Sequence, residues 1–185
     1  MEEIYANDFF DIIVIVNKNA LIKDKIVELI NLKNIAGKVI EEKKRELILK
    51  KILINLINNK ISSLEEAYKI TETELNQQSS KYKFDKNVFK TGWAERLIRT
   101  QLSRFYNQAV LEILIKKGEI NCYIPHSKFE KSDSNCSKFL SNSSQNVKIL
   151  LERLVKNYED GNWDNQLKIP NHPHCTHVIM PLKKE

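Results

Sequence analysis

In the stretch "TGWAERLIRTQLSRFYNQAVLEILIKKG" (residues 91–118), the apolar residues recur at spacings of three and four. Thr91 is a candidate N-cap and Gly118 stands at a C-terminal cap position, so the pattern predicts one long helix. Its apolar stripe consists of Trp93, Leu97, Leu102, Phe105, Ala109 and Ile113, widened by Ile98, Tyr106 and Val110. Such a face is too wide for a helix on the surface, so we expect it to be buried.

A polar row on the same helix has two interpretations. The row consists of Arg96, Arg99, Ser103 and Asn107. Spacings of three and four place these side chains on one face, and such a row is most often solvated. The alternative is that Arg99 and Asn107 hold neighbouring backbone or side chains in a fixed arrangement.

The first half of the chain carries the pattern of a series of helices. Between residues 21 and 58 the apolar residues repeat with helical spacing, and Gly37 interrupts the pattern. Ser63 opens a capping-box pattern that predicts a third helix. Residues 9–16, "FFDIIVIV", fit a short strand and a helix about equally. We interpret residues 1–90 as a mainly helical arm or docking region that packs on itself or on a partner.

The second half mixes helix and strand signals. The patterns predict strands in "EINCYIPHSKF" (119–129) and "HVIMPL" (177–182), a helix in "VKILLERLVKNYED" (147–160) and a polar loop over residues 130–146. These signals predict an α+β fold, in which a helical N-terminal half precedes a small mixed domain. That domain covers residues 91–185 and contains one long buried helix and a short β-sheet.

Charge and cysteine content narrow the functional class. The 30 basic and 24 acidic residues give a net charge of +6, which favours polyanionic partners only weakly. No run approaches the roughly 18–20 apolar residues that span a bilayer, so we expect no membrane partner. Glu2 and Glu3 stand where a signal peptide carries positive charge, and we infer no export signal. Three cysteines favour metal binding or packing over a disulfide framework.

The hexapeptide "HPHCTH" (172–177) holds three of the four histidines and one of the three cysteines. His172 and Cys175 are separated by two residues, and Pro173 restricts the turn between them, so both side chains can converge on one point. If the chain leaves the turn extended, His177 projects from the same face as Cys175. One turn and one strand start therefore supply three zinc-type ligands.

A closed tetrahedral zinc site needs a fourth group, and Cys136 is the best candidate because it lies in a polar loop. Cys122 and His126 are the reserves. Metal binding would tie the loop of residues 131–146 to the C-terminal strand, with a free energy on the order of 10 kcal/mol or more.

Other interpretations of these side chains stay open. The imidazoles of the tail can simply make hydrogen bonds in an irregular segment. A histidine can activate Cys136 or Cys175 as a nucleophile, although no oxyanion donors or third group stand out. Cleavage of RNA by His126, Arg99 and a lysine is a further alternative.

The stretches "RLIRTQLSRFYNQAVLEI" (96–113), "YIPHSKFEKSDSNCSKFL" (123–140) and "IPNHPHCTHVIMPL" (169–182) together resemble the C-terminal domain of phage head morphogenesis proteins of the Mu F type. In that family a helix carries Arg-Thr-Glu and a following Asn, and a loop carries Asp and a Cys-x-x-Cys pair. The domain finishes with Pro-x-His-Pro-x-Cys-x-Cys before its last strand. The resemblance covers about residues 93–182.

Several residues match the family motifs in register. Arg99, Thr100 and Asn107 resemble the helix motif, although Gln101 stands where the family has Glu. The C-terminal motif is matched by Pro170, His172, Pro173 and Cys175. This second match is the most specific part of the resemblance.

Two departures concern the cysteines of the family. Cys136 resembles the second member of the Cys-x-x-Cys pair, but Asp133 occupies the position of the first. His177 replaces the final cysteine, and an imidazole is also a zinc ligand. The resemblance thus leaves one complete set of candidate metal ligands, namely Cys136, His172, Cys175 and His177.

The resemblance implies a structural, non-enzymatic minor head protein of a phage or prophage, with structural zinc as its cofactor. Such a protein is made in the bacterial cytoplasm and takes part in head morphogenesis as a component of the prohead and virion. Its implied partners are the portal or other head proteins, together with a weak contact to DNA. The alternative function is that of a small nuclease or toxin-like enzyme, since related domains also occur beside toxins.

Overall fold

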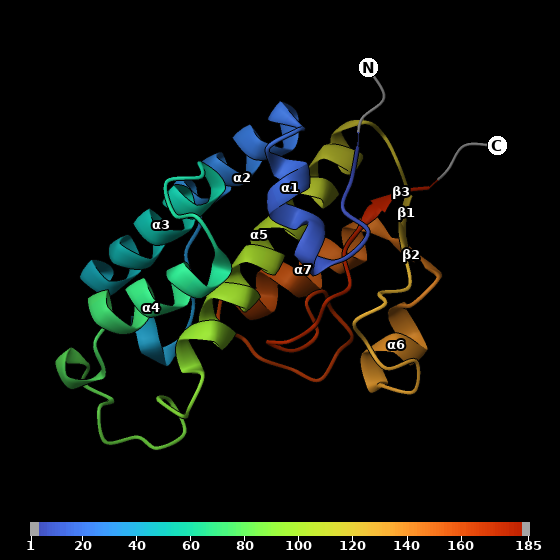
Figure 1. Ribbon diagram of the computed structural model, residues 1–185. Helices are drawn as coiled ribbons and strands as arrows, with labels where there is room; N and C mark the ends of the chain where they lie inside the picture. Colours follow the sequence, from blue (N-terminus) through green and yellow to red (C-terminus); the bar gives the residue numbers. More distant parts are fainter. Residues whose placement is uncertain (1–3, 183–185) are drawn as a thin grey trace.

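Helix α5 (Trp93–Lys116) runs through the middle of the molecule, with other elements packed on both sides (Figure 1). The computed structural model describes residues 4–182. Every residue of α5 from 100 to 111 is buried, including the polar ones, so neighbouring elements surround this part of the helix. The burial that the wide apolar stripe predicts is confirmed from Ile98 onward, whereas Trp93 and Leu97 are half-buried.

The start of α5 differs from the prediction, because its N-cap is Gly92 and not Thr91. Gly92 has a φ of +74°, a left-handed conformation that glycine adopts at little cost. The guanidinium of Arg96 reaches back and donates to the carbonyl oxygens of Thr91 (2.7 Å) and Lys90 (3.0 Å). At the other end Gly118 takes a left-handed conformation at the predicted cap position.

The first half of the chain forms a series of helices, and residues 9–16 are helical and not a strand. These helices are η1 (Phe9–Asp11), α1 (Ile12–Val16), α2 (Ala20–Leu32), η2 (Lys38–Ile40), α3 (Lys43–Ile57), α4 (Leu64–Glu74) and η3 (Gln77–Ser79). The Ser63 hydroxyl caps α4 by accepting from the amide of Glu66, as predicted. The carboxylate of Glu66 accepts from the amide of Ser62 and not from that of Ser63.

The apolar faces of α2 and α4 lie against α5, so the two halves of the chain share one buried core (Figure 1). The stripe of α2 is at most 1% exposed and consists of Ile22, Ile26, Leu29 and Ile30. This stripe is therefore covered within the chain and is not free to dock a partner. The division into residues 1–90 and 91–185 stays a prediction.

Three short strands form an antiparallel sheet in the order β2-β1-β3. They are β1 (Asn121–Ile124), β2 (Ser143–Asn146) and β3 (Met180–Pro181). Cys122 in the central strand pairs with Gln145 on one side and with Pro181 on the other. This sheet beside a helical body confirms the α+β class, with a helical first half and one long buried helix.

Residues 130–146 contain regular structure where the sequence predicts a polar loop. Helix α6 (Asn135–Leu140) begins after Ser134, whose hydroxyl accepts a hydrogen bond from the amide of Ser137. Strand β2 consists of Ser, Gln and Asn residues, which show no apolar alternation. It is held by backbone pairing with β1, so the sequence pattern does not reveal it. Helix α7 (Val147–Tyr158) follows, close to its predicted limits, and packs on α5.

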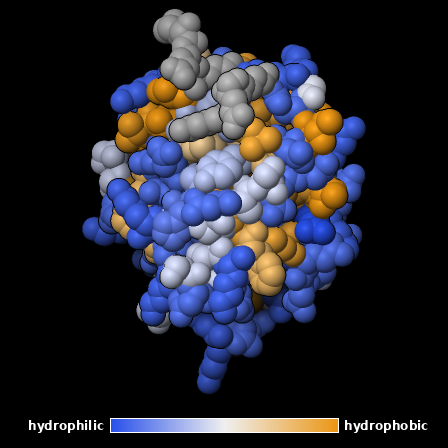
Figure 2. Space-filling view, turned by 90° about the vertical axis from the view of Figure 1, so that its right-hand side faces the viewer, coloured by the Kyte–Doolittle hydropathy of each residue, from blue (hydrophilic) through white to orange (hydrophobic). Residues whose placement is uncertain are grey.

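The face of the molecule over α6 and the strands is mostly hydrophilic, and its apolar side chains form separate patches (Figure 2). Small, separate apolar patches of this kind are normal on protein surfaces. Within residues 4–182, no helix combines the length and the apolar character needed to cross a membrane.

Two leucines of α2 offer a matched test of the core. Leu29 is 1% exposed, whereas Leu32, in the same helix, is 72% exposed. We expect Leu29→Ala to lower the free energy of unfolding by about 2–5 kcal/mol, because it removes buried methyl groups and leaves a cavity. Leu32→Ala should change it by less than about 0.5 kcal/mol. Urea titrations followed by circular dichroism measure both, and equal effects would contradict this packing.

Candidate metal centre

Four ligand-type side chains converge, two from the segment between β1 and β2 and two from the C-terminal tail (residues 169–182). They are Glu130, Cys136, His172 and Cys175, and one ligand atom of each lies within 4.8 Å of all the others. Three of them, all except Glu130, belong to the predicted set of zinc ligands. The structure therefore contains a group of side chains that can hold a metal ion.

Short local structures position these ligands. Cys136 lies in the first turn of α6, directly after the N-cap Ser134. The amide of Cys175 donates to the carbonyl oxygen of His172 (3.0 Å), which closes the turn that contains Pro173. Two residues that the sequence places three apart are thereby brought to one point, as their spacing predicts.

The thiols of Cys136 and Cys175 lie within 4.8 Å of each other. Hydrogen bonding between them lowers the pKa of Cys136, and the same interaction together with burial raises the pKa of Cys175 well above its ordinary value. The Sγ atom of Cys136 also lies 3.2 Å from Nε2 of His172 and 3.4 Å from Oγ of Ser134. A metal ion that binds here would displace protons from these thiols, because the thiolate is the ligand form.

Glu130 is held in the cluster by the tail of the chain. Its Oε1 atom accepts a hydrogen bond from the amide of Thr176 (3.0 Å) and lies 3.7 Å from Nε2 of His172. The hydroxyl of Thr176 in turn lies 2.8 Å from that of Ser127. Glu130 is not predicted by the sequence pattern, because no ligand spacing links it to a cysteine. Its position at the start of the loop that contains Cys136 was the one available signal.

The fourth predicted ligand, His177, lies beside this group and not within it. Its Nδ1 atom is 3.6 Å from Sγ of Cys175, in line with the predicted shared face, and the residue is completely buried. Burial lowers the pKa of His177. The reserve ligands also lie outside the group: Cys122 is bonded within the sheet, and Nδ1 of His126 lies 2.8 Å from Oγ of Ser141.

Two residues of the polar row of α5, Arg99 and Asn107, bond to the tail. Asn107 is completely buried, and its side-chain amide donates to the carbonyl oxygen of Ser103 (2.8 Å) while its Oδ1 accepts from the amide of Ile179 (2.9 Å). Arg99 donates to the carbonyl oxygen of His174 (3.3 Å). The alternative in which Arg99 and Asn107 hold neighbouring backbone is therefore confirmed.

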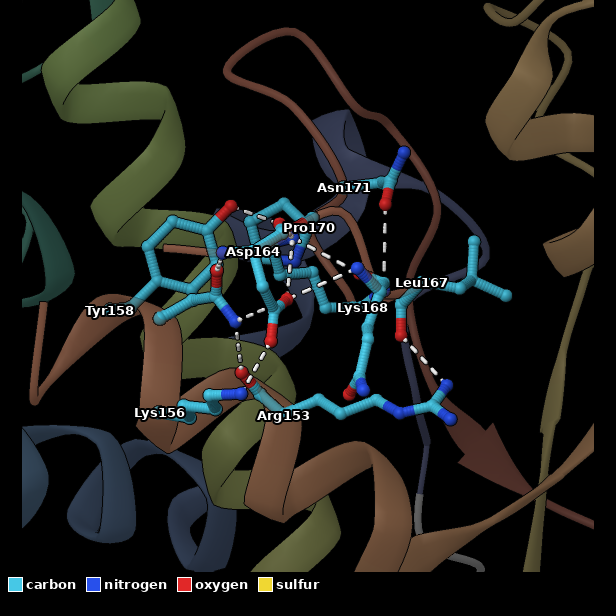
Figure 3. A network of polar contacts seen from close by, with 10 residues as sticks. Arg153, Lys156, Tyr158, Asp164, Leu167, Lys168, Pro170 and Asn171 are labelled. Atoms are coloured by element: carbon cyan, nitrogen blue, oxygen red, sulfur yellow. Dashed lines mark hydrogen bonds and ion pairs between the residues drawn. The ribbon is translucent and has the colours of Figure 1, made fainter. Parts of the chain in front are cut away.

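Polar side chains hold the loop between α7 and the tail (Figure 3). Asp164 lies at its centre, with Oδ2 2.7 Å from Nζ of Lys156 and Oδ1 accepting a hydrogen bond from Asn157 (3.3 Å). The hydroxyl of Tyr158 donates to the carbonyl oxygen of Pro170 (2.7 Å). These bonds fix the chain immediately before the turn that carries two of the cluster's ligands.

A cleft of about 450 Å³ lies next to the cluster. Its walls include Thr100 and Pro173 of the predicted motifs together with His172.

The nuclease alternative names His126, Arg99 and a lysine. Arg99 bonds to the backbone of the tail, and the imidazole of His126 lies against the hydroxyl of Ser141.

No family model, no curated protein and no solved structure matches this chain. The resemblance to head morphogenesis proteins of the Mu F type therefore stays a prediction from the motifs. The chemical capacity of the cluster follows from its own geometry, which does not depend on any relative.

Asn107 provides a test of the anchor between α5 and the tail. We expect Asn107→Ala to lower the free energy of unfolding by about 1–3 kcal/mol, because the buried amide of Ile179 loses its acceptor. The control is Asn31→Ala, whose exposed amide donates to Val27 one turn earlier; its effect should stay below about 0.5 kcal/mol. Chemical denaturation measures both, and a neutral Asn107→Ala would mean that the tail is held by other contacts.

Asp164 makes the stability of the folded chain depend on pH under acidic conditions. The bond from Lys156 lowers the pKa of Asp164 from its ordinary 3.8 to about 2. A lowered pKa means that the ionised carboxylate stabilises the folded chain above about pH 4, and that this contribution is lost as the pH falls to about 2. We expect the stability difference between the wild type and Asp164→Asn to shrink across this range in thermal melts. A difference independent of pH would contradict this role.

Proposed function

We propose that the cluster is a structural zinc site in a minor head protein of a phage or prophage. The observation that carries the zinc assignment is the convergence of two thiols, one imidazole and one carboxylate from the segment between β1 and β2 and from the C-terminal tail. Zinc takes these ligand types in proteins and prefers four of them in a tetrahedron. Four protein ligands leave no open position for a substrate, which is the arrangement of a structural site.

The distances in the cluster suit such an ion. Bonds of about 2.3 Å to sulfur and about 2.0–2.2 Å to nitrogen and oxygen place tetrahedral ligands roughly 3.3–3.8 Å apart. The ligand atoms here lie within 4.8 Å of one another, so modest side-chain rotations would close the site. The buried Cys175 and the tethered carboxylate of Glu130 would restrict the access of water.

Zinc at this place would fasten the segment that precedes β2 to the turn that precedes β3. Structural zinc binds with an apparent free energy on the order of 10 kcal/mol. That energy is comparable to the whole folding stability of a small domain. A tail with little regular structure would thus be held as firmly as the helical core.

The assignment to a phage head is supported by the residues that carry the resemblance. Arg99 and Asn107 of the helix motif hold the tail, and His172 and Cys175 of the C-terminal motif lie in the cluster. One structural purpose, the fixing of the tail, accounts for both motifs. In this proposal the protein is made in the bacterial cytoplasm and joins the prohead beside the portal, without catalysis.

Metal analysis of protein purified without a histidine tag tests the zinc assignment. We expect about one zinc per chain in the wild type. Cys136→Ser and Cys175→Ser should each reduce zinc to a small fraction, because a hydroxyl is a far poorer ligand than a thiolate. Cys122→Ser is the matched control and should keep its zinc, since that thiol lies outside the cluster. Equal zinc in all four proteins, or none in the wild type, contradicts the assignment.

Co-expression with the portal protein of the same phage or prophage tests the role in the head. We expect the two proteins to co-purify and this chain to be found in proheads in a few copies. A chain that stays monomeric with the portal present and is absent from purified particles would overturn the assignment to the head. The zinc measurement stands independently of that result.

A further inference from the structure

The segment "KYKFDKNVFK" (81–90) interleaves lysines and aromatic residues in the connector that leads into α5. It forms the loop that extends from the helices at the lower left of Figure 1. Four of its ten residues are lysines, and its one acidic residue, Asp85, is paired with Lys38 (3.1 Å). No ion pair joins these four lysines to a carboxylate in the part of the chain that the structure describes. The segment is therefore a local concentration of uncompensated positive charge.

An aromatic ring stands among these charges in open solvent. Phe84 is 85% exposed, more than any other large apolar residue that the structure describes. Nζ of Lys83 lies 5.2 Å from its ring centroid, and Nζ of Lys81 lies 5.2 Å from that of Tyr82. A phenyl ring at this exposure contributes nothing to the core, but it offers a free face for stacking.

The same segment forms one wall of the cleft of about 450 Å³. Asn87 and Val88 line it from the connector, and Trp93, Arg96 and Trp163 line it from the other sides. The indole of Trp163 is 58% exposed. The volume lies in the range of pockets that take a nucleotide-sized ligand.

We infer that the connector and this cleft bind single-stranded nucleic acid, with one base stacked on Phe84, a second base in the cleft and the phosphates on the lysines. Proteins that bind single strands without sequence preference combine a positive groove with aromatic stacking platforms. A duplex fits this surface less well, because its bases are already stacked and their faces are not accessible. The inference is independent of the zinc site and of the role in the head.

Fluorescence anisotropy with a labelled oligothymidylate tests the inference on the full chain. We expect binding that weakens with salt, with a slope of log affinity against log salt of about −2 to −3, because about four phosphates meet lysines. Phe84→Ala and Trp163→Ala should each weaken binding by roughly fivefold or more through lost stacking. A duplex of the same length should bind more weakly than the single strand.

Two triple-alanine variants distinguish binding at this segment from a general effect of the protein's positive charge. Lys81→Ala/Lys83→Ala/Lys86→Ala should weaken binding by roughly tenfold or more and flatten the salt slope by about two. The control Lys44→Ala/Lys116→Ala/Lys148→Ala removes the same charge from exposed positions on three other helices and should change affinity less than about threefold. Circular dichroism confirms that each variant is folded.

Three results would overturn the inference. The first is the absence of binding to oligothymidylate at low salt, and the second is an equal effect of the two triple-alanine variants. The third is binding that depends on Phe84 to vesicles of equal parts phosphatidylserine and phosphatidylcholine, without binding to the oligonucleotide. That last result would identify the segment as a contact for an anionic membrane surface.

Discussion

The contact between the Cys136 thiol and the His172 imidazole, 3.2 Å long, joins two segments that are 36 residues apart in sequence. Between α7 and residue 182, where the described part of the chain ends, only two residues lie in a strand. Side-chain contacts and not a regular backbone ladder therefore determine the position of the tail. Glu130 and Cys175 complete the same point of convergence. A divalent ion bound there would turn a set of weak polar contacts into one strong tether.

Helix α5 supplies the second constraint, because it is buried among other helices and yet presents polar groups to the tail. The Asn107 amide and the Arg99 guanidinium satisfy tail backbone groups that the short strand β3 leaves without ladder partners. The tail also contributes to the cleft, because His172 lines it together with Asn87 and Val88 of the connector. The proposed metal site and the proposed nucleic-acid surface are therefore neighbours, although neither requires the other.

The sequence predicted the parts of the fold that follow from apolar spacing. The long buried helix, the helices of the first half and the α+β class are such parts, because burial imposes a period on the residues themselves. Helix α6 and strand β2 could not be predicted in this way, since their side chains are mostly polar and their pairing is made by the backbone. Two cluster ligands, His172 and Cys175, were predicted from their spacing around a local turn. Cys136 was predicted from its polar surroundings. Glu130 reaches the cluster only through the tertiary course of its loop, and His177 occupies the buried side of Cys175.

X-ray absorption at the zinc edge, recorded on protein purified without a histidine tag, identifies the ligands of the proposed zinc site. The geometry predicts about two sulfur ligands near 2.3 Å and two nitrogen or oxygen ligands near 2.0–2.2 Å, with the multiple-scattering signature of one imidazole. Two imidazole signatures would instead place His177 in the coordination sphere and remove Glu130. A spectrum without sulfur ligands, or with a shell of six oxygens, would contradict the assignment of a structural zinc site.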